Sequence, residues 1–273
     1  MLSECLRNVR TVMPLVHSIT NYVTINDVAN AVLACGGSPI MADEPDDAEE
    51  VTAICGGLNI NIGNLNRQTT EAMRIAGRRS RELGHVRVLD PVAAGASALR
   101  TRVCRELQGL VGFDAIRGNV SELKALALGS STTRGVDASA ADAVTDANLD
   151  EMVAFAKGYA REVGSIVAIT GAIDLVAAAD ACYVIRNGRA EMGRVTGTGC
   201  MLSGVLCAYL IANPTDRLEA AAAAVCLMGL AGEVGWSRMQ EGDGNATYRN
   251  RIIDALYTID GTQLDEGARH ELR

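Results

Sequence analysis

The sequence has few aromatic residues, few histidines and no run of basic residues. Only 3% of its 273 residues are aromatic, and three are histidine. Three scattered histidines without paired ligand spacing argue against a zinc site. The formal net charge is −8, and Lys and Arg form no cluster. Nucleic acids and anionic membranes are therefore poor partners for this chain.

The eight cysteines lack the spacing of a redox or metal motif. None forms C-x-x-C, and most lie in apolar segments, where Cys behaves as a small hydrophobic residue. The N-terminus has no apolar signal-peptide core, and the longest uncharged run, near 220–231, is too short to span a bilayer. We therefore expect a soluble, cytoplasmic protein without a disulfide framework.

The hydrophobic pattern predicts one α/β domain over residues 1–273. Hydrophobic residues make up 48% of the chain, which is enough for one large core. Predicted strands alternate with predicted helices, and this order is typical of a doubly wound, mainly parallel sheet. In such a sheet the ligand site lies beyond the carboxyl ends of the strands. The clearest of these strands are 38–42, 58–63, 86–90, 113–118 and 165–170.

The second half of the chain gives weaker signals. A hairpin is expected around Asp180, and Asn187-Gly188 predicts another hairpin turn followed by a further short strand. The charged tail, 265–273, is expected to be frayed. The Ser/Thr/Ala/Asp-rich stretch 129–146 is expected to be a loop and matches no motif.

The most informative stretch is Gly193–Gly204. Two glycines flank Thr198, and the uncharged run Met201–Ala212 predicts a buried helix directly afterwards. A loop that turns on glycines into a helix leaves backbone N–H groups free to bind an anion. Cys200 falls in the first helical turn, where the pKa of a thiol is expected to be lowered. This stretch therefore predicts a phosphate cradle beside a possible proton acceptor.

A glycine-rich turn before a helix also has a purely structural explanation, because glycine is common wherever the backbone must turn sharply. The stretch is not a dinucleotide fingerprint, since Gly204 comes too late after Gly197 and Gly199 for G-x-G-x-x-G. It is not a P-loop either, because no Gly-Lys-Ser/Thr follows.

Asp90, Arg117 and Thr170 lie where predicted strands end, and Glu122 lies in the helix predicted after one of them. Asp90 is able to hold Mg²⁺ or to cap a turn. Glu122 follows Asn119 at the spacing of a capping box, so capping is its default role and metal binding the alternative. Arg117 suits phosphate, or forms a surface ion pair. Thr170 donates a hydroxyl to phosphate, or simply ends a strand.

The order of these residues says more than any one of them. Four features follow one another along the chain: an acid after a strand, then Arg-Gly-Asn-x-x-Glu, then Thr-Gly after a strand, and finally a loop that binds an anion and opens a helix. Together they favour phosphoryl transfer, which needs positive charge around the transferred group rather than a covalent nucleophile.

In these motifs and their order the chain resembles the hydroxyethylthiazole kinases, the thiamine-salvage branch of the ribokinase-like superfamily. Its cysteine at position 200 is specific, because most ribokinase-like relatives carry Asp there as the base. The matching segments extend from near one end of the chain to near the other: 14–22, 37–42, 58–63, 89–92, 116–122, 169–171 and 195–203.

The resemblance implies a function and a role for each site residue. The reaction is ATP-dependent phosphorylation of the hydroxyl group of 4-methyl-5-(2-hydroxyethyl)thiazole, with Mg²⁺ as cofactor. The family also implies a homotrimer with its sites at subunit boundaries. The implied roles are substrate contacts for Asn21, Met41 and Gly197, ATP contacts for Arg117 and Thr170, phosphoryl binding for Thr196, Gly197, Thr198 and Gly199, Mg²⁺ for Asp90 and Glu122, and catalysis for Cys200.

The sequence leaves alternatives open. Another ribokinase-like small-alcohol kinase, such as one for a hydroxymethylpyrimidine, is disfavoured by Cys200. A non-catalytic nucleotide-binding subunit is disfavoured by the retained Asp90, Arg117, Glu122 and Cys200. One departure from the family is Ala93, which stands where the family usually has glycine, and its methyl group is expected to crowd the phosphate region.

Overall fold

The protein is built around one mixed sheet, described here from a computed structural model that covers residues 1–128 and 143–273. In the described chain the strand order is β2-β1-β3-β4-β5-β6-β7-β8-β9. The pairs from β2 to β6 are parallel, and those from β6 to β9 are antiparallel. The strands are β1 Leu15–Ile19, β2 Ser38–Ile40, β3 Gly57–Asn61, β4 Val86–Asp90, β5 Ala115–Gly118, β6 Ile166–Ile169, β7 Asp174–Ala177, β8 Cys182–Ile185 and β9 His270–Leu272. The predicted doubly wound, mainly parallel sheet is confirmed.

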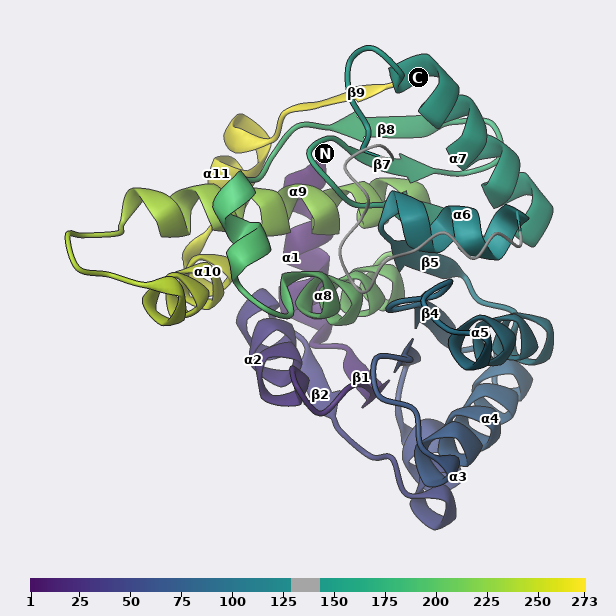
Figure 1. Ribbon diagram of the computed structural model, residues 1–273. Helices are drawn as coiled ribbons and strands as arrows, with labels where there is room; N and C mark the ends of the chain where they lie inside the picture. The colour runs from purple at the N-terminus through teal and green to yellow at the C-terminus, as the bar shows by residue number, and fades with distance from the viewer. Residues whose placement is uncertain (129–142) are drawn as a thin grey trace.

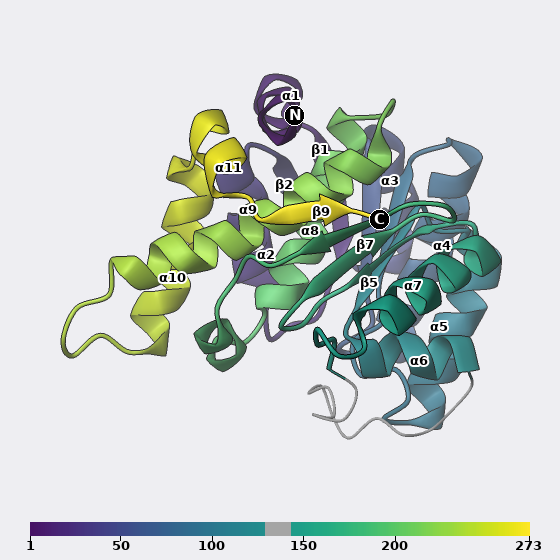
Figure 2. The ribbon, with the colours of Figure 1, turned by 90° about the horizontal axis from the view of Figure 1, so that it is seen from above.

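Helices cover both faces of this sheet (Figures 1 and 2). One face packs α1 (Leu2–Val12), α2 (Ile25–Cys35), α8 (Thr198–Ala212) and α9 (Arg217–Ser237) into one core, with α10 (Asn245–Thr258) and α11 (Gly261–Gly267) outside them. The other face carries a second core under α3 (Pro45–Ile54), α4 (Arg67–Glu82), α5 (Ala98–Val111), α6 (Val120–Leu128) and α7 (Leu149–Val163). Two apolar faces of one sheet are thereby removed from water.

The helices α8 and α9 run through the interior and are apolar on nearly every side. A helix without a polar face is stable in water only when neighbours surround it. By length and composition α9 would also be able to cross a membrane, but 78% of its most apolar stretch is buried inside the fold. Its composition is therefore explained by its place in the core. The described cysteines, eight in all, are free and buried, as expected of small hydrophobic residues.

The C-terminal half corrects two predictions. The hairpin around Asp180 is confirmed by β7 and β8. The strand predicted after Asn187-Gly188 is wrong, because residues Ala190–Arg194 form a short 3-10 helix, η2. The tail predicted to be frayed is also wrong: β9 pairs with β8, with His270 opposite Ile185. The strand beside β8 that was expected directly after the Asn187-Gly188 turn comes instead from the C-terminal tail, as β9. Of the loop predicted at 129–146, residues 129–142 lie outside the described residues.

Candidate active site

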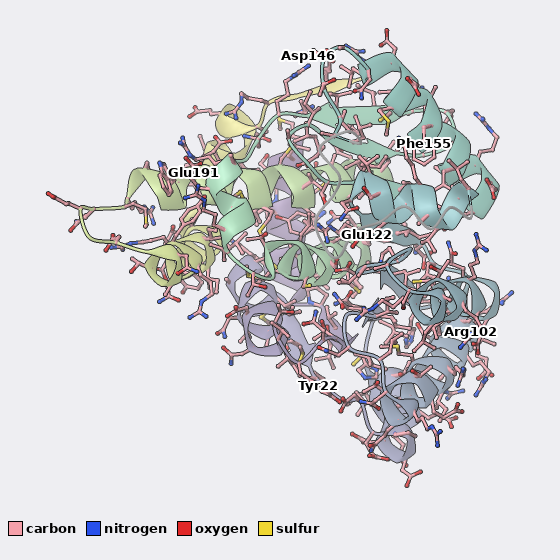
Figure 3. All side chains as sticks on the ribbon, viewed as in Figure 1. Tyr22, Arg102, Glu122, Asp146, Phe155 and Glu191 are labelled. Carbon is pink, nitrogen blue, oxygen red and sulfur yellow. The ribbon has the colours of Figure 1, made fainter. Side chains whose placement is uncertain are left out.

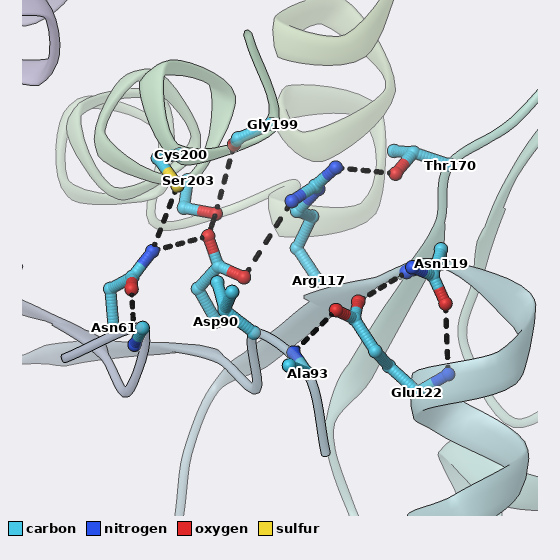
Figure 4. A network of polar contacts seen from close by, with 12 residues as sticks. Asn61, Asp90, Ala93, Arg117, Asn119, Glu122, Thr170, Gly199, Cys200 and Ser203 are labelled. Carbon is cyan, nitrogen blue, oxygen red and sulfur yellow. Dashed lines mark hydrogen bonds and ion pairs between the residues drawn. The ribbon is translucent and has the colours of Figure 1, made fainter. Parts of the chain in front are cut away.

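Residues at or just after the carboxyl ends of β1, β3, β4 and β5 lie against the first turns of α8, and Thr170, just after β6, contacts Arg117 of β5 (Figure 4). The parallel register sets Asn61, at the end of β3, directly opposite Asp90, at the end of β4. The predicted site residues come from segments far apart in the sequence, and the parallel sheet brings their backbone positions to one edge.

The start of α8 is shaped by two glycines. Gly197 precedes the helix with φ +89°, a conformation that L side chains rarely adopt, and a Cβ there would meet the side chain of Thr24. A Cβ on Gly199 would lie within 3.0 Å of the Arg117 guanidinium. No side chain caps the start of α8 in the described structure. The first turn therefore offers backbone donors and a positive dipole end next to an arginine, which suits a phosphate.

Arg117 lies between a carboxylate and a hydroxyl. Its Nη2 donates to Thr170 Oγ1 over 2.6 Å, and its Nη1 lies 3.6 Å from Asp90 Oδ1. The Asp90 side chain is fully buried and that of Arg117 is 13% exposed. Burial raises the pKa of Asp90, and the nearby Arg117 opposes that rise. The pair predicted to bind ATP, Arg117 and Thr170, is thus in direct contact.

Cys200 belongs to a buried hydrogen-bond network (Figure 4). Its Sγ accepts from Asn21 Nδ2 and from Asn61 Nδ2, each over 3.2 Å. Asn61 Nδ2 also donates to Asp90 Oδ2 over 2.8 Å, and Ser203 Oγ donates to the same oxygen over 2.8 Å. Asn61 and Ser203 were not among the predicted site residues. A polar residue inside the predicted strand 58–63 or inside the apolar run 201–212 is the signal that would have found them.

The expected lowering of the Cys200 pKa is wrong. Burial and the charge of Asp90 raise the pKa of this thiol, and hydrogen bonds and Arg117 only partly oppose them. Cys200 is the third residue of α8, so the helix terminus is close, but burial disfavours the charged thiolate there. The thiol is protonated at neutral pH.

Glu122 caps the helix that begins after β5. Its Oε2 accepts from Asn119 N over 2.9 Å, and Glu122 N donates to Asn119 Oδ1 over 2.9 Å, the reciprocal pair of a capping box. Its Oε1 accepts from Ala93 N over 2.7 Å. Burial, followed by repulsion from Asp90, raises the pKa of Glu122 to about 7. The predicted capping role is confirmed, and the same carboxylate also holds the loop after β4.

The remaining candidates lie at the same edge or serve the core. Met41 is half-buried and directly follows β2, the neighbour of the strand that leads to Asn21. His17 is buried, with Nδ1 2.9 Å from Thr52 Oγ1 and Nε2 2.8 Å from the Ala42 carbonyl oxygen. Both ring nitrogens of His17 therefore have partners inside the fold, which is a structural role.

A cavity of about 530 Å³ opens beside this site. Its volume is in the range of small-molecule and cofactor sites. One part is lined by Arg117, Thr170, Thr198 and Gly199, and another by residues of the segment 187–193 and by Val225 and Met228 of α9. The predicted ATP contacts and half of the predicted phosphate loop therefore share one cavity.

A mainly parallel sheet with an uncapped helix start, a buried Asp–Arg pair and an adjoining cavity at its carboxyl edge defines a ribokinase-like small-molecule kinase. For the fold, a ribokinase-like superfamily protein from Enterococcus faecalis matches with a TM-score of 0.62 at 14% identity, over 96% of this chain and 88% of that one. A model of the hydroxyethylthiazole kinase family matches residues 6–262, and the chain belongs to this family.

Individual relatives agree with this assignment. The hydroxyethylthiazole kinase of Clostridium acetobutylicum is 52% identical over 99% of both chains, and that of Desulfovibrio desulfuricans is 43% identical over 97% of this chain and 96% of its own. A solved hydroxyethylthiazole kinase structure from Pyrococcus horikoshii has a TM-score of 0.88 at 33% identity, over 100% of this chain and 98% of that one. The predicted family, fold and kinase class are confirmed.

Proposed function

We propose that this chain phosphorylates the hydroxyl group of 4-methyl-5-(2-hydroxyethyl)thiazole with ATP, in thiamine salvage. The observation that carries the proposal is the position of the first turn of α8. Gly199 contacts Arg117 on the cavity side, and the next residue, Cys200, accepts hydrogen bonds from Asn21 and Asn61. A nucleotide in the cavity and an alcohol near Cys200 would meet at one helix terminus.

Each predicted residue has a part in this arrangement. Arg117 and Thr170 bind the phosphates of ATP, and the loop Thr196–Gly199 holds the transferred group with its backbone donors. Asn21, Met41 and Gly197 contact the thiazole alcohol. These roles rest on the family resemblance and are supported by the contacts of Arg117 with Thr170 and of Asn21 with Cys200.

The chemical step is positioning followed by in-line displacement. The hydroxyethyl oxygen attacks the γ-phosphorus, the bond between that phosphorus and the β–γ bridging oxygen breaks to release ADP, and the hydroxyl proton passes to a phosphate oxygen or to solvent. A loose transition state needs little deprotonation of the alcohol early on, so the arrangement of donors matters more than a strong base. A protonated, buried Cys200 fits a group that orients the hydroxyl. The charge on the transferred group is met by Arg117 and by the start of α8.

Asp90 and Glu122 would hold Mg²⁺, and the donor set fits that ion. Asp90 Oδ1 is buried and accepts no hydrogen bond in the described structure. Carboxylate oxygens are the ligands that Mg²⁺ prefers, usually with several waters. Each Glu122 oxygen accepts one backbone N–H and keeps a further lone pair. When bound, Mg²⁺ neutralises charge on the phosphates. Among residues 1–128 and 143–273, no three His, Cys, Asp or Glu side chains cluster tightly enough to form a metal site alone, so phosphate oxygens and water would complete the shell.

We further propose a single-domain, cytoplasmic enzyme that works as a homotrimer with its sites at subunit boundaries. Tyr22 and Val23 directly follow Asn21, and they are 54% and 68% exposed. Figure 3 shows Tyr22 at the periphery of the chain. A partner subunit would cover this apolar pair beside the thiazole site. Light scattering coupled to size exclusion measures the assembly.

The test of function is ADP release with ATP and Mg²⁺, in the presence and absence of the thiazole. Thiazole-dependent ADP release is the expected result. Release with a hydroxymethylpyrimidine alone would support another small-alcohol kinase, and ATP binding without turnover of either alcohol would support a nucleotide-binding subunit. Both outcomes would overturn the proposal.

A further inference from the structure

One side of the cavity is formed by a segment outside any strand. Asn187, Gly188, Arg189, Ala190, Met192 and Gly193 all line it. We call residues 187–193 the 187–193 wall. It follows β8, includes most of η2 and lies beside α9. Glu191, which belongs to it, is labelled in Figure 3. Because no sheet ladder fixes this backbone, its position depends on other contacts.

Glu233 of α9 supplies such contacts from behind the wall. Its Oε1 accepts from Gly188 N over 2.6 Å and from Asn187 Nδ2 over 3.3 Å. Glu233 does not line the cavity. Burial raises its pKa, but hydrogen bonds from Arg269 and Gly188 outweigh burial, so the pKa lies below its ordinary value. An ionised carboxylate therefore holds the start of the wall.

Arg269, just before β9, binds Glu233, and we call this Glu233–Arg269 pair the clamp. Its Nη2 and Nη1 donate to the two Glu233 oxygens over 2.7 and 3.0 Å, and its Nη2 also donates to the Arg186 carbonyl over 2.7 Å. Its backbone N donates to Asn187 Oδ1 over 2.8 Å, and Asn187 Nδ2 donates to the Gly267 carbonyl over 2.9 Å. The C-terminal segment is thus hydrogen-bonded to both the oxygen and the nitrogen of the Asn187 side-chain amide.

Two glycines of α9 allow the 187–193 wall to pack directly against this helix. A Cβ on Gly229 would lie within 3.0 Å of Asn187, and a Cβ on Gly232 would collide with the Met192 side chain. These two glycines form a notch one turn apart, into which the wall packs. Polar contacts at Gly188 and close packing at Met192 therefore hold the wall at two points.

We propose that Glu233, clamped by Arg269, positions the 187–193 wall of the nucleotide site and so sets the affinity for ATP without touching it. The inference rests on the proposed function, which places ATP in this cavity. The C-terminal segment becomes part of the nucleotide site through the clamp, whereas the residues proposed to contact the thiazole, Asn21, Met41 and Gly197, do not line this cavity. Glu233 is a positioning residue with an effect confined to one of the two substrates.

The test compares Glu233→Ala and Glu233→Gln with the wild type. Calorimetry with a non-hydrolysable ATP analogue and Mg²⁺ measures nucleotide affinity, and steady-state kinetics give kcat and both KM values. Loss of hydrogen bonds to a charged group predicts a roughly tenfold weaker nucleotide Kd and higher KM for ATP in Glu233→Ala. Glu233→Gln keeps one acceptor oxygen and is expected to fall in between. The KM for the thiazole and kcat stay within about twofold.

Glu106→Gln is the matched control. Glu106 also accepts two hydrogen bonds from one arginine, Arg74, over 2.6 and 3.1 Å, but on the opposite face of the sheet between α4 and α5. It is expected to leave nucleotide affinity unchanged. Glu233 variants that are less thermostable yet bind the analogue like the wild type, or that lose both substrates equally, would show a merely structural role and overturn the inference. A wild type that binds no nucleotide would instead overturn the proposed function.

Discussion

Arg117 Nη1 lies 3.6 Å from Asp90 Oδ1, across the neighbouring strands β5 and β4. That oxygen accepts no hydrogen bond in the described structure, and Arg117 Nε has no partner there either. The guanidinium therefore keeps donor capacity while it is held by Thr170 and attracted by Asp90. Such an arginine is ready for a bidentate contact with phosphate.

Gly199→Ala is expected to lower kcat/KM by about 10- to 100-fold. The new Cβ would lie within 3.0 Å of the Arg117 guanidinium, so either Arg117 or the start of α8 must shift. Overpacking of this kind costs about 1–3 kcal/mol, and each 1.4 kcal/mol in the barrier is about tenfold in rate. Steady-state kinetics with a thermal-shift measurement separate the loss of rate from loss of fold.

Gly158→Ala serves as the control for that substitution. Gly158 lies inside α7, and a Cβ added there would meet no neighbouring atom within 4 Å. Alanine at this position is expected to stabilise the protein by about 0.5–1 kcal/mol and to leave the kinetics unchanged. Wild-type kinetics in Gly199→Ala would contradict a tight fit between Gly199 and Arg117.

Much of this site was predictable because parallel sheets align the ends of their strands. Asp90, Arg117 and Thr170 were predicted from strand ends, and the α8 start from its glycines. The Asn61–Asp90 contact depends on strand register, which the sequence alone does not give. The pairing of β9 with β8 and the Glu233–Arg269 clamp join residues far apart in the chain. No local turn signal contains that information, so the tail was predicted to be frayed.

Cys200→Ser is expected to reduce kcat by less than about tenfold and to leave its pH dependence unchanged between about pH 6 and 9. Burial and Asp90 raise the pKa of the thiol, so the thiolate is scarce and a hydroxyl orients the substrate about as well. Cys200→Asp is expected to be far less active, because it buries a second carboxylate near Asp90. A large loss in Cys200→Ser, with a limb missing from the pH–kcat profile, would show that the thiol acts as the base.

Ala93→Gly is expected to stabilise the protein by about 1 kcal/mol. Ala93 has φ +58°, the left-handed region that costs an L residue about 1–2 kcal/mol, and glycine relieves this cost at the expense of some chain entropy. The hydrogen bond from residue 93 N to Glu122 Oε1 is retained, since residue 93 contributes only its backbone to it. Urea unfolding measures the gain. A loss of stability would mean that the buried methyl contributes more packing than strain.

The free energy of unfolding is expected to fall as pH rises above about 9. Burial raises the pKa of Cys5, Cys55 and Cys182 to about 11 and that of Cys35 and Cys226 to about 12, from an ordinary value of 9.0. Above pH 9 the unfolded chain loses thiol protons that the folded chain keeps. The stabilising contribution is therefore complete below the unfolded pKa and is lost as pH rises toward the folded pKa.

Urea titrations under reducing conditions between about pH 7.5 and 9.5 measure this slope before tyrosines ionise in the unfolded chain. Each fully ionising thiol adds about 1.4 kcal/mol per pH unit. Cys226→Ala is expected to lower stability at every pH, because it removes a buried sulfur, and to flatten the slope by the share of one thiol. An equal slope in Cys226→Ala and wild type would mean that this thiol ionises alike in the folded and unfolded chains, contrary to its burial in α9 against the sheet.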